Sequence, residues 1–288
     1  NGITFGAVGS GTTVTNLQVY SVFDDGIEMF GGAVNVTNYA AVYVNDDSID
    51  LDEGWKGSVR NALVIQSATD GNHCVEADGI GSYKADEVAR NQDLVARGLN
   101  TQANLVNLTC IVSPNGGETA THDPGAGLRL REGITATVTD LLVVSSFIDD
   151  SSANNYCFRP QDAETTVTVN GVFACVDKFA SDGEAVAAAN DVQFATLTGT
   201  TDPTAAADTG LVLLEIGANA AETAPVFSVA FDNMLVDGAA PTVSLDTDAD
   251  GDLTTGRLGA ITTAATNPFA GWTYGIFDGN RGQALYFE

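Results

Sequence analysis

Acidic residues recur at matching places in a short phrase that the N-terminal part of the chain repeats. The phrase is an alternating apolar and acidic strand that ends at a glycine, as in residues 24–32, 46–54 and 75–79. It places Glu28, Asp50 and Glu76 at one position and Asp52 two residues after Asp50. Copies stacked about 4.8 Å apart would bring these charges into repulsion, by about 1 kcal/mol in water and about 3–4 kcal/mol at an effective dielectric constant near 20.

Hard cations are the chemistry that suits such a column of carboxylates. Ca²⁺ takes oxygen ligands in irregular geometry and would relieve the repulsion. We therefore predict that Glu28, Asp50, Asp52 and Glu76 bind Ca²⁺. A screened acidic face that holds only diffuse counter-ions is the alternative that the sequence leaves open.

A second acidic motif lies near the C-terminus. Asp246, Asp248 and Asp250 stand at positions 1, 3 and 5, a glycine follows at position 6, and Asp252 comes next. This order matches the start of a calcium loop. The twelfth position is Arg257 instead of a bidentate glutamate, which excludes a complete EF-hand. The motif predicts a partial calcium loop, with an Asp-rich turn as the alternative.

The elements that position the first acidic column follow from the spacing of the phrase. Asp25 and Asp47 are 22 residues apart, which is about one turn of a β-solenoid. Alternation places Ile27 and Ile49 on the inner face and the acidic residues on the outer face. Glycines after each strand permit the tight corners at which the next side of the coil begins.

A second strand repeats in every coil with an asparagine at one place. Such an asparagine can adopt left-handed backbone angles at a corner and bond to its neighbours above and below. The recurring residues are Asn16, Asn38, Asn61, Asn107, Asp140, Asn170 and Asn233. This pattern predicts an all-β parallel β-helix over residues 1–240 with insertions at about 80–102, part of it helical, and at about 177–224. An aromatic-rich tail, residues 241–288 with the Asp-rich loop, is predicted to cap the last coil.

Composition excludes several classes of partner. The 288 residues carry 38 acidic and 11 basic side chains, a formal net charge of −27. Such a surface repels nucleic acid and anionic membranes. No apolar run is long enough to span a bilayer. No signal peptide stands at the start, and the pattern is entered in mid-strand, so we expect upstream coils or a cleaved leader.

The phrases quoted above, the opening GITFGAVGSGTTVTNLQV, GLRLREG and the ending LGAI…FAGWT resemble a widespread family of secreted bacterial surface proteins. That family has a right-handed parallel β-helix of the pectin-lyase-like type, and most of its members have no assigned function. The resemblance covers the chain to about residue 144 and again at 258–273. It implies the fold and an extracellular location, and it carries over no catalytic residue.

The cysteines predict a disulfide framework. An even number of cysteines in a secreted chain tends to pair, although four allow three pairings. We predict the pairs in sequence order, each of which joins a first strand to the following second strand: Cys74–Cys110 and Cys157–Cys175. Zinc is disfavoured because the chain has no C-x₂-C motif and its two histidines, His73 and His122, have no paired partner.

Two functions remain. The favoured one is a calcium-stabilised structural or adhesive protein of the cell surface, which self-associates or binds other surface components. The alternative is a polysaccharide lyase, a hydrolase or a glycan-binding module that uses a face with Trp55, Arg129 and Arg131. Ion pairing between coils explains the two arginines without catalysis, and the chain has neither a nucleophile motif nor a phosphate-binding loop.

Overall fold

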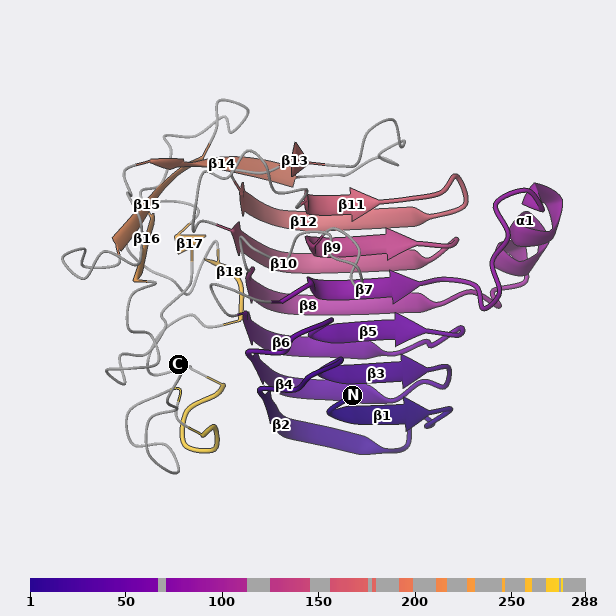
Figure 1. Ribbon diagram of the computed structural model, residues 1–288, viewed down its shortest axis with the longest axis horizontal. Helices are drawn as coiled ribbons and strands as arrows, with labels where there is room; N and C mark the ends of the chain where they lie inside the picture. The colour runs from indigo at the N-terminus through magenta and orange to yellow at the C-terminus, as the bar shows by residue number, and fades with distance from the viewer. Residues whose placement is uncertain are drawn as a thin grey trace.

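The computed structural model describes most of the N-terminal two thirds of the chain and short segments beyond. The described residues are 1–66, 71–112, 125–145, 156–175, 178–179, 192–198, 211–216, 227–230, 245–246, 257–260, 268–274 and 276. They form two long sheets that stack coil upon coil, one helix and a small strand pair (Figure 1). No helix among these residues is long and apolar enough to cross a membrane.

The first sheet contains one short strand from each coil. Its order is β1 (Ile3–Gly6), β3 (Ile27–Phe30), β5 (Ile49–Asp52), β7 (His73–Asp78), β9 (Ala126–Arg131), β11 (Tyr156–Pro160) and β13 (Lys178–Phe179). Every pairing in this sheet is parallel. The acidic phrase therefore forms successive turns of a parallel β-helix, as predicted.

The second sheet contains the strands with the asparagine. Its parallel part runs through β2 (Thr13–Tyr20), β4 (Asn35–Val42), β6 (Ser58–Ile65), β8 (Gln102–Ile111), β10 (Thr135–Ser145), β12 (Thr166–Cys175) and β14 (Val192–Thr198). It continues in antiparallel pairing through β15 (Leu211–Ile216) and β16 (Phe227–Ala230). The separate pair is β17 (Leu245–Asp246) with β18 (Arg257–Leu258).

Among the described residues, the second sheet changes from parallel to antiparallel pairing after β14, whereas the sequence predicted a parallel β-helix to about residue 240. The segment 177–224, predicted to be an insertion, contains β13, β14 and β15. Apolar and β-branched residues recur in both of its longer strands, VQFATLT and LVLLEI, and favour pairing with the sheet over leaving it.

The first insertion matches the prediction. Between β7 and β8 the chain leaves the coils and forms α1 (Val88–Ala96), which lies beyond the end of the stacked strands in Figure 1. The insertion is attached by its flanks. Asn100 Nδ2 donates to the Gly133 carbonyl at 2.8 Å, and Tyr83 OH donates to Glu164 Oε2 at 2.8 Å.

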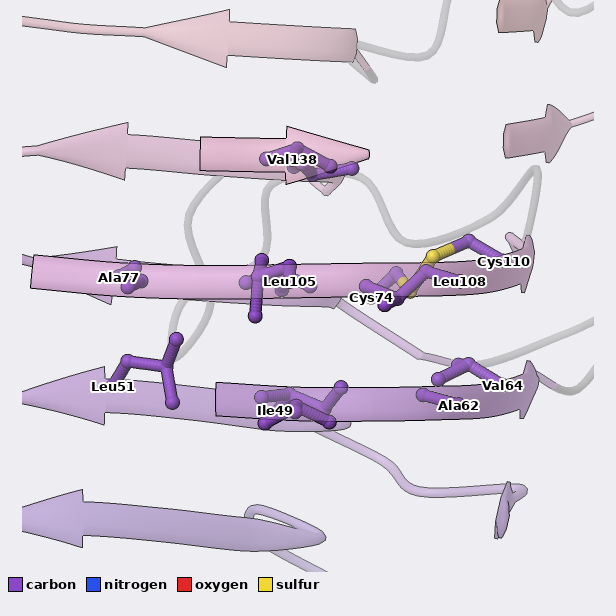
Figure 2. Packing of buried hydrophobic residues seen from close by; sticks show 14 of the residues in the cluster. Ile49, Leu51, Ala62, Val64, Cys74, Ala77, Leu105, Leu108, Cys110 and Val138 are labelled. Atoms are coloured by element: carbon purple, nitrogen blue, oxygen red, sulfur yellow. A yellow bond between two sulfur atoms is a disulfide. The ribbon is translucent and has the colours of Figure 1, made fainter. Parts of the chain in front are cut away.

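The core lies between the two sheets. Inward residues of the first sheet, such as Ile49 and Leu51, face Ala62 and Val64 of the second, and all four are fully buried (Figure 2). Alternation along each strand brings equivalent apolar side chains into register in the next coil. Burial of each large side chain contributes about 1.5–3 kcal/mol.

The asparagine column is present at one corner. Asn16, Asn38, Asn61 and Asn107 have φ angles of 57°, 58°, 53° and 57°. From Asn38 onward, each side-chain amide donates to the preceding asparagine of the column, at 2.8, 2.9 and 2.9 Å. Asp140 continues the positive φ at 55°. The side chain of Asn170 and the whole of Asn233 lie outside the described residues.

The described segments of the C-terminal tail contact the second sheet. The predicted cap on the last coil stays a prediction, because most of residues 241–288 lie outside the described residues. Gly259 N donates to the Asp140 carbonyl at 2.9 Å and Ala260 N to Thr109 Oγ1 at 2.8 Å. Tyr274 exchanges two hydrogen bonds with the Gln18 side chain on β2. These contacts place residues 259–260 and Tyr274 against the outer face of the second sheet, Tyr274 at its first coil.

The reason for this placement is an apolar row on that face. Thr109 and Gln18 stand in register with Ala40 and Leu63, which are fully buried although they face away from the central core. In this row Ala260 N contacts Thr109 and Tyr274 contacts Gln18. Consecutive apolar residues in β4 and β6, in place of strict alternation, indicate a strand buried on both faces.

Candidate metal centre

The acidic column lies on the outer face of the first sheet in the predicted register. Glu28 is paired with Asp50, and Asp50 with Glu76. The column continues into Arg129 of β9. These side chains are far less exposed than a solvated acidic face would be: Glu28 is 8% exposed, and the Glu76 side chain is 15% exposed.

A second row of polar side chains lies at the corner before each strand. Asp25 Oδ1 accepts the backbone N–H of Asp47 at 3.3 Å, and Asp47 Oδ1 accepts the backbone N–H of His73 at 3.1 Å. Each carboxylate thus holds the next coil in place. Asp25, Asp47 and His73 are all buried.

The two rows meet in a cluster of three carboxylates. Asp25, Glu28 and Asp50 each offer one oxygen, and these oxygens lie within 4.8 Å of one another. Thr4 Oγ1 donates to Glu28 at 3.5 Å, and the Asn1 amide also donates to it. Within the described part of the chain, no lysine or arginine forms an ion pair with any of the three carboxylates.

Burial and mutual repulsion disfavour the ionised form of the three carboxylates in this cluster. Burial, then Asp24 and Asp46, raise the pKa of Asp25 to about 7. Burial and Asp24 raise the pKa of Glu28, and burial with the charge of Asp47 raises the pKa of Asp50 well above its ordinary value. Protons or a cation are needed to compensate these charges.

A more exposed acidic group shares one of these residues. Asp24, Asp25 and Asp46 offer three oxygens within 4.8 Å of one another, and the Asp24 side chain is 55% exposed. Asp25 therefore belongs to both groups.

Further along the same sheet, arginines of β9 form ion pairs with the acidic side chains of β7. Arg129 NH1 donates to Glu76 Oε1 at 2.9 Å, and Arg129 Nε donates to Gln161 Oε1 at 2.9 Å. Arg131 makes two bonds to Asp78, at 2.5 and 2.9 Å, and its NH2 lies 3.4 Å from Glu76 Oε1. The ion pairs that were expected between coils are thus present.

The residues of the predicted glycan face, Trp55, Arg129 and Arg131, do not form an exposed surface together. Trp55 is fully buried, and its Nε1 donates to the Val34 carbonyl at 3.2 Å. The ring fills space left by Gly57, where a Cβ would lie 2.5 Å from Trp55 Cζ2. Arg129 is only 6% exposed, so two of the three residues lack a surface for a sugar.

The other predicted metal ligands have different positions. Asp52 lies in the neighbouring column, and its carboxylate accepts the N–H of Glu53 at 2.7 Å. Burial raises the pKa of Asp52 to about 6. Asp246 lies in β17, where its backbone pairs with Arg257. Asp248, Asp250 and Asp252 lie outside the described residues.

One predicted disulfide is present. Cys74 and Cys110 are bonded, with Cα atoms 5.9 Å apart, and they connect the two sheets through the core (Figure 2). The bond closes a separation of 36 residues, which stabilises the fold by about 3–4 kcal/mol in the chain-entropy model. The side chains of Cys157 and Cys175 lie outside the description.

Sequence reasoning missed the position of His73, which it considered only as a zinc ligand without a paired partner. The residue opens β7, is 1% exposed and contacts Asp47, with Nδ1 and Oδ1 2.5 Å apart. Aligned copies of the phrase contain the signal, because His73 stands three residues before Glu76 as Asp25 and Asp47 stand before Glu28 and Asp50.

Comparisons with known proteins agree with this architecture. Residues 1–213 match the family of the pectate-lyase-like beta helix domain. No curated protein and no solved structure matches the chain. The family match covers well over half of the 288 residues and includes the coils that form the acidic column. The chain belongs to the pectate-lyase-like β-helix domain family.

Proposed function

We propose that this chain is a calcium-stabilised structural and binding region of an extracellular or cell-surface protein. The observation that carries the proposal is the cluster of Asp25, Glu28 and Asp50, whose three oxygens lie within 4.8 Å of one another on successive coils. A cation bound there would join the coils and remove a repulsion that the fold otherwise retains.

The donor set suits calcium. Ca²⁺ binds six to eight oxygens at about 2.3–2.6 Å, so two ligands on opposite sides of one ion lie about 4.6–5.2 Å apart. Three carboxylate oxygens within 4.8 Å fit such an ion, with backbone carbonyls or water as the remaining ligands. Three carboxylates also favour a hard divalent cation over a soft one.

The disulfide supports an extracellular location. Disulfides form and persist in oxidising compartments and are rare in the cytosol. The bond between Cys74 and Cys110 lies in the core, and Cys74 belongs to β7, the strand that also carries Glu76. In such a location a rigid coil stack can display its loops to polysaccharides, to other surface components or to a second copy.

A calcium-dependent lyase is the second candidate, because acidic coils stand beside Arg129 on the outer face of the first sheet. A base must reach the proton that it removes. Arg129 is instead held by Glu76 and Gln161 and is nearly fully buried. Trp55 is in the core and cannot stack on a sugar ring. These observations favour the scaffold.

Thermal melting of the full chain in calcium and in chelator tests the proposal. Calcium that binds only the folded state stabilises it by about 2.7 kcal/mol at a hundredfold excess over Kd. Chelation should therefore lower Tm, and Asp50→Asn should remove the response. Asp86→Asn, at an exposed position in the first insertion, is the matched control and should keep it.

An unchanged Tm in chelator would contradict the calcium scaffold. The same samples should be incubated with acidic polysaccharides, such as alginate and pectate. Unsaturated products that require calcium and disappear in Arg129→Ala would favour the lyase instead.

A further inference from the structure

A second set of candidate metal ligands lies beside the carboxylate cluster and differs from it in chemistry. His73 Nδ1 lies 2.5 Å from Asp47 Oδ1 and 4.0 Å from Glu76 Oε1. One ligand atom from each of the three residues lies within 4.8 Å of the other two. Imidazole nitrogen is a ligand that Zn²⁺ and other first-row transition metals prefer, whereas Ca²⁺ prefers oxygen.

The fold holds the three side chains in place before any ion arrives. Asp47 lies at the corner before β5, and its carboxylate is fixed by the backbone N–H of His73 at 3.1 Å. His73 and Glu76 both lie on β7, three residues apart. Arg129 donates to Glu76 at 2.9 Å, in the manner of the outer residues that orient ligating carboxylates.

The distances suit a small tetrahedral ion. Zn²⁺ bonds nitrogen and oxygen at about 2.0–2.2 Å, so two ligand atoms of one tetrahedral ion lie about 3.3–3.6 Å apart. The two distances from His73 Nδ1, 2.5 and 4.0 Å, lie on either side of that range. Side-chain shifts of less than about 1 Å would bring the three atoms to this spacing, with water as the fourth ligand.

We propose that Asp47, His73 and Glu76 bind a first-row transition-metal ion. Among such ions, Zn²⁺ fits the site best. The ion would link two successive coils. His73 and Cys74 are adjacent in β7, so a metal and a disulfide would hold the start of this strand from its two faces. Asp47 and His73 are 5% and 1% exposed, so these two ligands are almost completely shielded from solvent. The proposal is independent of the calcium cluster, which uses Asp25, Glu28 and Asp50.

The competing account is a plain ion pair between a protonated His73 and Asp47, with no metal. The two accounts differ in what zinc does. A metal site binds one equivalent of Zn²⁺ and excludes a proton from Nδ1, whereas an ion pair gives no saturable zinc binding.

Calorimetric titration of the full chain with Zn²⁺, after dialysis against chelator and in millimolar Ca²⁺, tests the proposal. One equivalent should bind. His73→Gln and Asp47→Asn should each weaken zinc binding by at least about 100-fold. Mutation of a residue that only orients a metal ligand already lowers metal affinity by up to about that factor. His122→Gln, which changes the other histidine of the chain, should leave the affinity unchanged.

A spectroscopic measurement covers the case in which His73→Gln does not fold. Pulsed EPR of the wild-type chain loaded with one equivalent of Cu²⁺ should show coupling to one directly bound imidazole nitrogen. Absence of that coupling, absence of zinc binding, or zinc binding unchanged in a folded His73→Gln would each overturn the proposal. The calcium response of Tm should persist in His73→Gln, so failure of this site and failure of the calcium scaffold are distinguishable.

Discussion

Two neighbouring parts of one sheet face handle buried charge in opposite ways. Asp25, at the corner before β3, clusters with Glu28 of β3 and Asp50 of β5, and no lysine or arginine among the described residues is ion-paired to them. One coil further, on β7 and β9, Glu76 is paired with Arg129. We call the first the acidic part and the second the ion-paired part.

The pKa values of the carboxylates shift in opposite directions in the two parts. In the acidic part burial and like charges act together, and the pKa of Asp25 rises to about 7. In the ion-paired part burial still raises the pKa of Glu76, but His73, Arg131 and Arg129 outweigh it and leave that pKa below its ordinary value. The β-helix fixes where outward side chains stack, and residue type decides whether their charge is compensated within the protein.

Removing the arginine from the ion-paired part should have the largest effect. Arg129→Ala leaves Glu76 buried without its 2.9 Å partner, and the loss of one member of a buried pair costs about 3–5 kcal/mol. Urea unfolding in chelator measures it. Arg129→Met combined with Glu76→Gln should recover most of the loss, because no uncompensated charge remains.

The control for this variant is an exposed pair. Arg97 and Asp93 on the first insertion are 3.0 Å apart with side chains 61% and 62% exposed. Arg97→Ala should change the free energy of unfolding by less than about 0.5 kcal/mol. Equal effects of the two arginine variants would remove the distinction between the two parts.

The acidic part should make stability fall as pH rises. The pKa of Asp25 is about 7 in the folded chain, whereas an aspartate in an unfolded chain titrates near 3.9. The folded state therefore binds more protons between these values, and its free energy of unfolding falls as pH rises through them. For Asp25 we expect a loss of about 2 kcal/mol between pH 5 and 7.5, after allowance for solvent screening.

Urea unfolding at these two pH values, in chelator and in calcium, measures this dependence. Calcium should abolish most of it, and Asp25→Asn should flatten it in chelator. The ion-paired part has the opposite sign, because the lowered pKa of Glu76 gives stability that is lost only when pH falls below about 4. Stability in chelator that rises from pH 5 to 7.5 would contradict the description of the acidic part.

A smaller effect is expected from neutralising one carboxylate without calcium. Asp50 faces Asp47, Glu76 and Asp25, and all three charges raise its pKa further. Asp50→Asn removes this repulsion and should stabilise the chain in chelator by about 1 kcal/mol. The same change at Asp86 should be neutral. Destabilisation by Asp50→Asn in chelator would show that the carboxylate has a favourable partner.

Local patterns were sufficient to predict the coils. The spacing from Asp25 to Asp47 gave the turn length, alternation gave the register of Glu28 with Asp50, and recurrence of Asn16 and Asn38 gave the corner. Each of these features depends on residues within one or two coils. The Cys74–Cys110 pair followed from the same repeat, because it joins strands of successive steps along the chain.

Features that depend on distant or alternative packing could not be predicted in this way. The tail reaches Gln18 from residue 274, a contact that no repeat indicates. Trp55 enters the core because Gly57 leaves room for its ring, although an aromatic side chain after a strand is equally typical of a binding face. The burial of Glu28 and His73 was missed because alternation gives the direction of a side chain and not what covers it.

The most direct test of the account is an anomalous difference map from a crystal of the chain grown in calcium. The account predicts a peak between Asp25, Glu28 and Asp50, at about 2.3–2.6 Å from a carboxylate oxygen of each. A map with calcium bound elsewhere and no peak among these three residues would contradict the account.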